Sequence, residues 1–225
     1  FGRCRERMRS MKRVLCFGDS NTWGQVPAAT KRYSRSERWP GIVAQAVGSQ
    51  VAVLENGICG RSTVWDDPLL PSRNGSVGLK EALLTECPLD LLILSLGTND
   101  LKFGTPDQIA QGMRTLIEIA QNADAVLKPV GSVFPGECKI LILSPVSLHR
   151  EIAKISTESS LRGFYQQSTE LASCLQRVAK EMKTDFMDAN GFAQASDKDG
   201  IHMDRQSHMQ LGCAVANRVK QILAL

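Results

Sequence analysis

Short apolar runs alternate along the chain with longer segments in which hydrophobic residues recur at helical spacing. The short runs are typical of buried strands, and each ends near glycine, proline or a polar turn residue. They predict strands over residues 13–17, 51–55, 89–96, 139–144 and 185–187. The longer segments predict helices over residues 39–47, 77–86, 105–122, 157–182 and 204–223.

The most hydrophobic run, residues 89–96, is almost continuously apolar. Such a run is typical of the centre of a parallel sheet that helices cover on both faces. The alternation of strands and helices predicts an α/β protein, and right-handed crossovers place helices on both sides of the sheet. We therefore predict a three-layer α/β/α sandwich around a five-stranded parallel sheet.

The composition of the chain is that of an ordinary globular protein. Of its 225 residues, 43% are hydrophobic and 22% are charged, which excludes wholesale disorder. The net charge is +4, from 27 basic and 23 acidic residues, and much of the excess lies before residue 14. We interpret residues 1–10 as an N-terminal extension or the remnant of a tag, and we predict one domain over residues 11–225. Because that domain is nearly neutral, we expect no nucleic-acid-binding groove.

The seven cysteines are scattered, odd in number, and without a CxxC motif or zinc-ligand spacing. This pattern predicts free thiols in a reducing compartment, hence a cytoplasmic protein, and it predicts no metal site. No apolar run approaches the roughly 18 residues that a membrane span needs. The basic N-terminus also lacks the apolar core of a secretion signal. We therefore expect no membrane partner.

Reactive polar residues follow four of the predicted strands. Ser20 comes after the first strand, Gly60 after the second, Asn99 after the third, and Asp199 with His202 after the fifth. In open α/β sheets, ligands bind outside the carboxyl ends of the strands, so these loops are expected to converge. Together they supply a hydroxyl, a backbone N–H, a carboxamide, a carboxylate and an imidazole. These groups are the components of a serine nucleophile, its base, its orienting acid and an oxyanion hole.

Each of these residues, taken singly, also has an ordinary structural interpretation. Ser20 suits a turn or a helix cap, Asn99 a helix cap, and Asp199 a tight turn. His202 by itself is no different from any surface histidine. Their joint occurrence, in loops that the topology brings together, is what favours a catalytic site.

Four sequence blocks carry a resemblance to a known family. They are Phe17-Gly18-Asp19-Ser20, Asn56-Gly57-Ile58-Cys59-Gly60, Gly97-Thr98-Asn99-Asp100 and Asp199-Gly200-Ile201-His202. In this order they resemble the SGNH (GDSL) hydrolase superfamily, from about residue 13 to the C-terminus. Three further motifs are similar to the bacterial arylesterase-like esterases, namely Trp23-Gly24, Arg61-Ser62-Thr63 and Asp66-Asp67-Pro68. The resemblance implies a flavodoxin-like fold.

The resemblance also implies a role for each candidate residue. Ser20 is expected to attack the acyl carbonyl, and its backbone N–H to help bind the oxyanion. Gly60 is expected to add a second backbone N–H to that oxyanion hole, and Asn99 a side-chain amide. His202 is expected to remove the Ser20 proton and return it to the leaving alcohol, while Asp199 holds the other imidazole nitrogen. No metal or organic cofactor is implied.

We therefore predict a serine esterase that hydrolyses short-chain acyl esters, aryl or small alkyl and acetyl, through an acyl-enzyme. Acyl transfer to alcohols is a second outcome of the same chemistry. Two alternatives share the fold: a carbohydrate acetyl esterase, and a lysophospholipase or thioesterase. A noncatalytic flavodoxin-like binding module is a third, but the chain has neither a GxGxxG nor a GxxxxGK(S/T) phosphate loop. The expected partner is a small ester, and exposed apolar loop residues would suit a homo-oligomer, which we expect of Leu69, Leu70 and Phe134.

One position departs from the pattern that names the family. The residue after Ser20 is Asn21, where that pattern has leucine. We predict that Asn21 and Trp23 line the acyl pocket, which the amide would make more polar or smaller. Trp23 could equally pack under the loop. The G-x-S-x-G pattern of ordinary α/β-hydrolases is absent, because residues 18–22 lack the second glycine.

Overall fold

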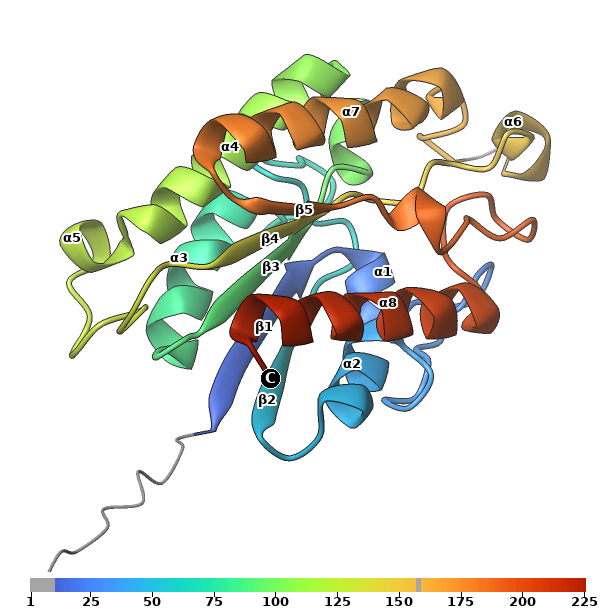
Figure 1. Cartoon of the computed structure of the whole chain (residues 1–225). Helices are drawn as coiled ribbons and strands as arrows, with labels where there is room; N and C mark the ends of the chain where they lie inside the picture. Colours follow the sequence, from blue (N-terminus) through green and yellow to red (C-terminus); the bar gives the residue numbers. More distant parts are fainter. Residues whose placement is uncertain (1–10, 157–158) are drawn as a thin grey trace, which may run out of the picture.

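A five-stranded parallel sheet forms the centre of the computed structural model. Its strands are β1 (Lys12–Gly18), β2 (Val51–Gly57), β3 (Leu91–Ser95), β4 (Ile140–Leu143) and β5 (Asp185–Met187). They lie in the order β2-β1-β3-β4-β5 (Figure 1), and every residue of the central strand β3 is buried, as the hydrophobic run predicted. The structure describes residues 11–156 and 159–225, so the prediction for residues 1–10 lies outside the described residues.

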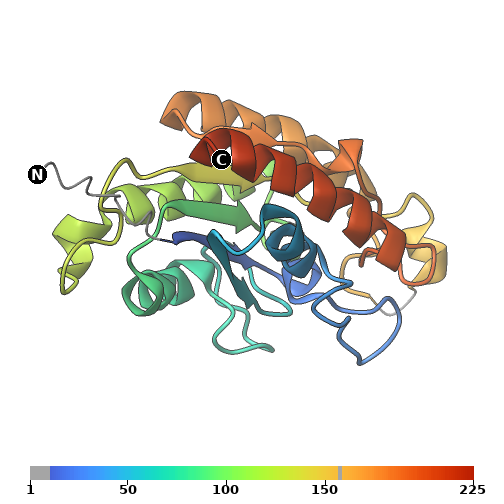
Figure 2. The same cartoon turned by 60° about the horizontal axis from the view of Figure 1, so that its bottom comes forward.

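Helices cover both faces of the sheet, which confirms the three-layer α/β/α sandwich (Figures 1 and 2). One face carries α3 (Gly75–Glu86), α4 (Pro106–Gln121) and α7 (Tyr165–Met182), and the other carries α2 (Trp39–Val47) and α8 (Arg205–Leu223). In β1, Leu15 and Phe17 are buried against the first set of helices, and Val14 and Cys16 against the second. A strand that is apolar on both faces is what a sheet covered on both sides requires.

The start of α4 follows the signals in its sequence. Thr105 is the N-cap: its hydroxyl accepts a hydrogen bond from the backbone N–H of Gln108, whose side chain accepts one from the N–H of Thr105. Pro106 occupies the first turn, where its missing N–H has no intrahelical partner to lose. Beyond Asn122 a short helix, α5 (Ala123–Leu127), follows α4.

The helix predicted over residues 157–182 is wrong at its start. Residues 157–158 lie outside the described residues, and α7 begins only at Tyr165. Turns precede it, and in them Leu161 packs into a third apolar cluster at the end of the sheet. Because Gly163 weakens a helix here and Leu161 gains burial in turns, tertiary packing overrides the helical spacing.

Four helices of a single turn follow the strands, and hydrophobic periodicity predicted none of them. They are α1 (Ser20–Trp23), η1 (Asn99–Lys102), α6 (Ile152–Ile155) and η2 (Ala189–Gly191). Helix α1 lies directly against the end of β1, and this close packing requires Gly18: a Cβ there would lie 2.1 Å from the Oγ1 atom of Thr22 in α1. Ser20, the first residue of α1, therefore lies at the carboxyl end of β1.

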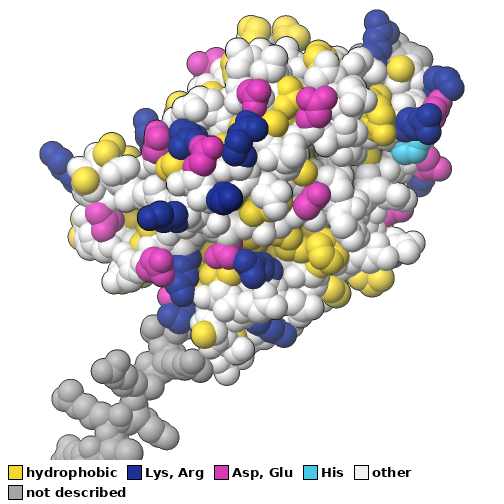
Figure 3. Space-filling view, turned by 45° about the horizontal axis from the view of Figure 1, so that its top comes forward, with side chains coloured by type: hydrophobic (Ala, Val, Ile, Leu, Met, Phe, Trp, Pro, Cys, Tyr) yellow, Lys and Arg dark blue, Asp and Glu magenta, His cyan; other side chains and the backbone are white. Residues whose placement is uncertain are grey.

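The outer face formed by α4 and α7 carries charges of both signs. In Figure 3, basic and acidic side chains are interspersed on this side of the molecule. Ion pairs join the two helices, Arg114 with Glu181 and Arg177 with Asp107. This face is therefore a solvated surface with charges of both signs.

Candidate active site

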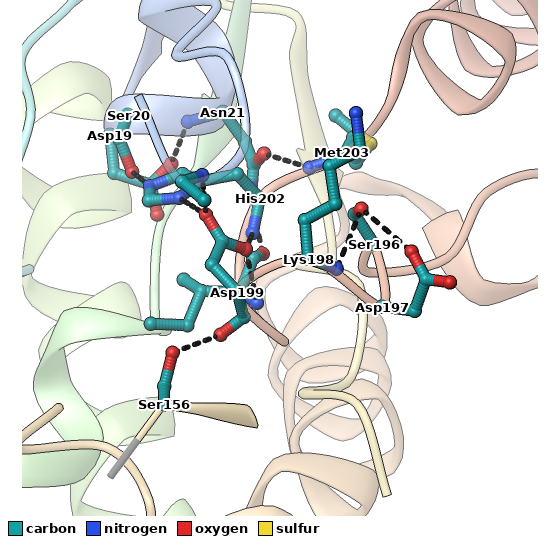
Figure 4. Close-up of polar contacts among 12 residues, drawn as sticks. Asp19, Ser20, Asn21, Ser156, Ser196, Asp197, Lys198, Asp199, His202 and Met203 are labelled. Atoms are coloured by element: carbon teal, nitrogen blue, oxygen red, sulfur yellow. Dashed lines mark hydrogen bonds and ion pairs between the residues drawn. The ribbon is translucent and has the colours of Figure 1, made fainter. Parts of the chain in front are cut away.

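Ser20, His202 and Asp199 lie in a continuous hydrogen-bonded line at the carboxyl end of the sheet (Figure 4). The Ser20 Oγ atom is 2.9 Å from His202 Nε2, and His202 Nδ1 is 2.7 Å from an Asp199 carboxylate oxygen. Ser20 is the first residue of α1, and the other two come from the loop that precedes α8. The side chains of His202 and Asp199 are each only 12% exposed, so the line is largely shielded from water. Three residues predicted from two separate blocks, residues 17–20 and 199–202, thus meet.

The Asp199 carboxylate is held by backbone groups as well as by the imidazole. One oxygen accepts the N–H groups of Ile201 and His202, each at 2.9 Å, and the other accepts the N–H of Ala28 at 2.9 Å. Burial by itself raises the pKa of Asp199. The hydrogen bonds and charge of His202, with the bond from Ile201, outweigh burial and hold that pKa below its ordinary value. The carboxylate is therefore ionised at neutral pH and can fix the imidazole tautomer.

The two loops predicted to carry oxyanion donors are tied to each other. The side-chain nitrogen of Asn99 donates to the carbonyl of Arg61 at 3.1 Å, and its second hydrogen, which has no partner among the described residues, can serve a ligand. The neighbouring carboxylate of Asp100 accepts the backbone N–H and the hydroxyl of Thr63, at 2.7 and 2.6 Å. Gly60 lies one residue before Arg61, so its N–H belongs to the same cross-linked unit.

Arg61 is a buried cation that joins the ends of β1 and β2. Its guanidinium donates to the carbonyls of Gly18 and Asn56, at 2.9 and 2.6 Å, and lies 3.9 Å from the centre of the Phe17 ring. Burial lowers the pKa of Arg61 to about 10, against the opposing charge of Asp19, so it remains protonated at neutral pH. Sequence reasoning used Arg61 only as part of a motif, because nothing in the local sequence indicates that it is buried.

Comparison with known proteins agrees with this geometry. The profile of the GDSL-like lipase/acylhydrolase family matches residues 16–209, which is most of the chain and includes every block of the site. The chain belongs to this family. No curated protein sequence matches it significantly.

Solved structures similar to this GDSL-like hydrolase indicate the class of enzyme within the family. The inhibitor-bound aryl esterase of M. smegmatis is 38% identical over 94% of this chain and 99% of its own, with a TM-score of 0.84. Est24, a carbohydrate acetylesterase from Sinorhizobium meliloti, is 34% identical over 94% of this chain and 99% of its own, with a TM-score of 0.85. With the family match, these similarities identify the chain as a serine ester hydrolase.

Two further carboxyl groups of this hydrolase are buried beside the site. Asp19 is 3% exposed and accepts the backbone N–H of Asn21, capping α1. Asp100 is fully buried, and among the described residues its second oxygen has no partner. Burial raises the pKa of each to about 6, although hydrogen bonds oppose the shift in both. Both groups therefore change charge between weakly acidic and neutral pH.

Asn21 and Trp23, which the sequence placed in the acyl pocket, make contacts of other kinds. The Asn21 amide oxygen accepts the backbone N–H of Met203 at 2.9 Å, and its nitrogen donates to the carbonyl of Ile201 at 3.4 Å. The Trp23 ring is partly exposed and carries the Arg32 guanidinium 5.1 Å from its centre. For both residues, a role in the pocket stays a prediction.

The other histidines do not compete for the position beside Ser20. His208 is fully buried in α8, where its Nδ1 atom accepts the N–H of Trp39 at 3.3 Å and burial lowers its pKa to about 4. It is therefore neutral and packed. His149 lies between β4 and α6, and its Nδ1 atom accepts the N–H of Glu151 at 3.1 Å. Neither imidazole contacts the Ser20 hydroxyl in the described structure.

Three further expectations concern metals, membranes and exposed apolar groups. Within residues 11–156 and 159–225, no cluster of His, Cys, Asp or Glu is suited to hold a metal ion. The helices of the same residues include none long and apolar enough to span a membrane. Leu69 and Leu70 are exposed, but Phe134 is 8% exposed and belongs to the apolar cluster on the face of the sheet that α3, α4 and α7 cover. The expectation that Phe134 is an exposed loop residue is wrong, because the loop folds its ring inward.

Proposed function

We propose that this chain hydrolyses short acyl esters through an acyl-enzyme formed on Ser20. The observation that carries the proposal is the unbroken line from the Ser20 hydroxyl through His202 to Asp199, with separations of 2.9 and 2.7 Å. A serine hydroxyl is a weak nucleophile unless a neighbouring base removes its proton during attack. His202 has the reach to do so, and the ionised Asp199 stabilises the imidazolium that results.

The reaction then proceeds in two halves. As Ser20 Oγ attacks the acyl carbon, its proton moves to His202, and the carbonyl oxygen becomes an oxyanion that the N–H groups of Ser20 and Gly60 and the Asn99 amide stabilise. His202 gives the proton to the leaving alcohol, and the ester bond to that alcohol breaks. In the second half, His202 takes a proton from water, the water attacks the acyl-enzyme, and the acid leaves while Ser20 regains its proton. No cofactor enters these steps.

We propose a short acyl group joined to an aryl or a sugar alcohol. The two similar enzymes are named an aryl esterase and a carbohydrate acetylesterase, and both are covered almost completely by this chain. Among residues 145–158, where a lid over long acyl chains would lie, the apolar residues Val146, Leu148 and Ile152 are buried in the fold, which supports the same view. An alcohol in place of water in the second half would give acyl transfer. Product analysis with added alcohol tests this, and release of free acid alone would exclude it.

The decisive test compares p-nitrophenyl acetate turnover by the wild type, Ser20→Ala and Ser168→Ala. Ser168 is a matched control, because it is a buried serine of α7 whose hydroxyl, within the described residues, bonds only to the backbone of Tyr165 and Leu148. We expect Ser20→Ala to lose about 10⁶-fold in kcat, with folded Ser168→Ala retaining activity. An inactive wild type, or an active Ser20→Ala, would refute the proposal. Organophosphate labelling and mass spectrometry would locate the nucleophile directly.

We further propose one domain over residues 11–225, a cytoplasmic location and assembly into a homo-oligomer. The free state of the six cysteines in the described residues supports a reducing compartment. Leu69 and Leu70, 86% and 38% exposed, are apolar groups that an interface would cover. Light scattering on the wild type and on a Leu69→Ser, Leu70→Ser double variant tests assembly. A monomeric wild type would exclude it.

A further inference from the structure

We propose that Asn21 is a positioning residue that holds the catalytic imidazole of His202 in reach of Ser20. This inference rests on the proposed function, because it assigns a role within the same reaction. The Asn21 amide accepts the N–H of Met203 and donates to the carbonyl of Ile201, so it binds the backbone on both sides of His202. Figure 4 shows the shorter of these bonds, with Asn21 between the nucleophile and the base loop.

The backbone segment around His202 also forms hydrogen bonds along the edge that faces away from Asn21. The carbonyl of His202 accepts the N–H of Ser196 at 2.8 Å, and Met203 pairs with Ala195 as an isolated antiparallel bridge. Asn21 supplies the hydrogen bonds on the opposite edge, from α1, the helix that begins with Ser20. The amide therefore connects the nucleophile and the base through their backbones as well as through their reacting atoms.

The environment of Asn21 makes this connection specific. Asn21 is 7% exposed, and its bond to the N–H of Met203 is buried, whereas its bond to the carbonyl of Ile201 is partly buried. Leucine, the residue of the family's name-giving pattern, has a similar volume but neither donor nor acceptor. With leucine, the N–H of Met203 and the carbonyl of Ile201 lose their partner and draw the loop toward water. A displacement of about 1 Å at a catalytic group costs on the order of a hundredfold in rate.

The test is the kinetics of Asn21→Leu with p-nitrophenyl acetate, together with the rate at which an organophosphate labels Ser20. We expect kcat and the labelling rate to fall together by about 10- to 100-fold. KM should change by less than about twofold, because the substrate contacts are intact. A merely structural role would leave the labelling rate of the folded enzyme unchanged, whereas loss of the base position slows it.

Asn190→Leu is the matched control. Its amide oxygen also accepts a backbone N–H, that of Ser147 at 2.7 Å, and in the part of the chain that the structure describes it has no bond to the segment around His202. We expect wild-type kcat and labelling for this variant. If Asn21→Leu does not fold, Asn21→Ala removes the same two bonds and is expected to give the same losses. Circular dichroism and the melting temperature establish that each variant is folded.

Two outcomes would overturn the inference. One is a folded Asn21 variant with wild-type kcat and labelling rate. The other is a raised KM at unchanged kcat, which would make Asn21 a pocket residue, as its position in the sequence first indicated. Both presuppose an active wild type and an inactive Ser20→Ala. If the wild type is inactive or Ser20→Ala is active, the proposed function itself fails, and this result is distinguishable from a failure of the inference about Asn21.

Discussion

On one side of Ser20, the loops that carry the proposed oxyanion donors are fixed by buried ionisable side chains. Arg61 joins the ends of β1 and β2, and Asp100 joins the loops after β2 and β3. On the other side, the loop that carries the proposed base is fixed by hydrogen bonds to its own backbone: the N–H groups of Ile201 and His202 donate to Asp199 within the loop, and the Asn21 amide binds a carbonyl and an N–H of the loop.

This difference corresponds to what each side does in the proposed reaction. Oxyanion donors are effective when they are fixed before charge develops, and buried cross-links between strand ends provide that rigidity. The imidazole must accept and return a proton. Its loop therefore has to keep the imidazole in one tautomer and at one distance from Ser20, but the loop itself does not have to be rigid. Mutations on the base side should therefore act on rate, and those on the oxyanion side on rate and stability together.

The largest effect is expected on the base side, from Asp199→Asn. The amide presents an N–H to the imidazole, which holds His202 in the wrong tautomer, and kcat should fall by about 10⁴-fold. Steady-state kinetics of the folded variant measures this. Asp197→Asn is the control, since that carboxylate bonds to Ser196 and not to the imidazole. A kcat near that of the wild type in Asp199→Asn would contradict the role of Asp199 as the acid that orients His202.

The next effect is expected from Asn99→Ala on the oxyanion side. Loss of one donor to the developing charge should lower kcat by about 10²- to 10³-fold. The control is Asn74→Ala, which removes the amide that caps α3 through the N–H of Ser76 at 3.0 Å. It should cost about 1 kcal/mol of stability with no change in kcat. Equal kinetics for the two variants would contradict the assignment of Asn99.

A smaller effect, on stability, is expected from Arg61→Met. The carbonyls of Gly18 and Asn56 would lose their buried donor, which should lower the free energy of unfolding by about 2–4 kcal/mol. Urea denaturation measures this. Arg177→Met, which breaks an exposed pair with Asp107, should give no measurable change. If the two variants unfold alike, buried cross-links are not what fixes the oxyanion side.

The smallest effect is a difference in how stability depends on pH on the two sides of Ser20. Asp100 has a folded pKa near 6, above its unfolded value, so the folded state holds its proton longer and stability falls as pH rises from about 4 to 6. Asp199, whose folded pKa is depressed, instead loses stability as pH falls below about 4. Asp100→Asn should therefore gain on the wild type by up to about 1.4 kcal/mol per pH unit across this window.

Urea denaturation at several pH values tests the comparison, and Asp124→Asn is the control. The pKa of Asp124 is lowered by hydrogen bonds from Ser132 and Val133, so its removal should give no such gain as pH rises. His208, with its pKa lowered to about 4, acts in the opposite sense to Asp100, but it is present in both proteins and cancels in the difference. A constant difference between Asp100→Asn and wild type would show that Asp100 does not titrate in this range.

Much of the fold follows from local chemistry. The continuous apolar run around β3 identifies the sheet centre, and Thr105 with Pro106 marks the start of α4. The single-turn helices were missed because they are too short for a hydrophobic period. The start of α7 was misplaced because burial of Leu161 in turns leaves the same apolar spacing as a helix.

The sequence by itself determined which reactive residues follow which strands, and therefore that Ser20, Gly60, Asn99, Asp199 and His202 belong to one edge of the sheet. Parallel strands bring their carboxyl ends together whatever the loops contain. Only the tertiary structure decided what holds those residues in place: the burial of Arg61 and Asp100, and the turn of Asn21 toward the base loop. Those contacts join residues as many as 182 positions apart, as between Asn21 and Met203. The local sequence does not indicate such a distant partner, because burial and side-chain direction are set only when the whole chain has packed.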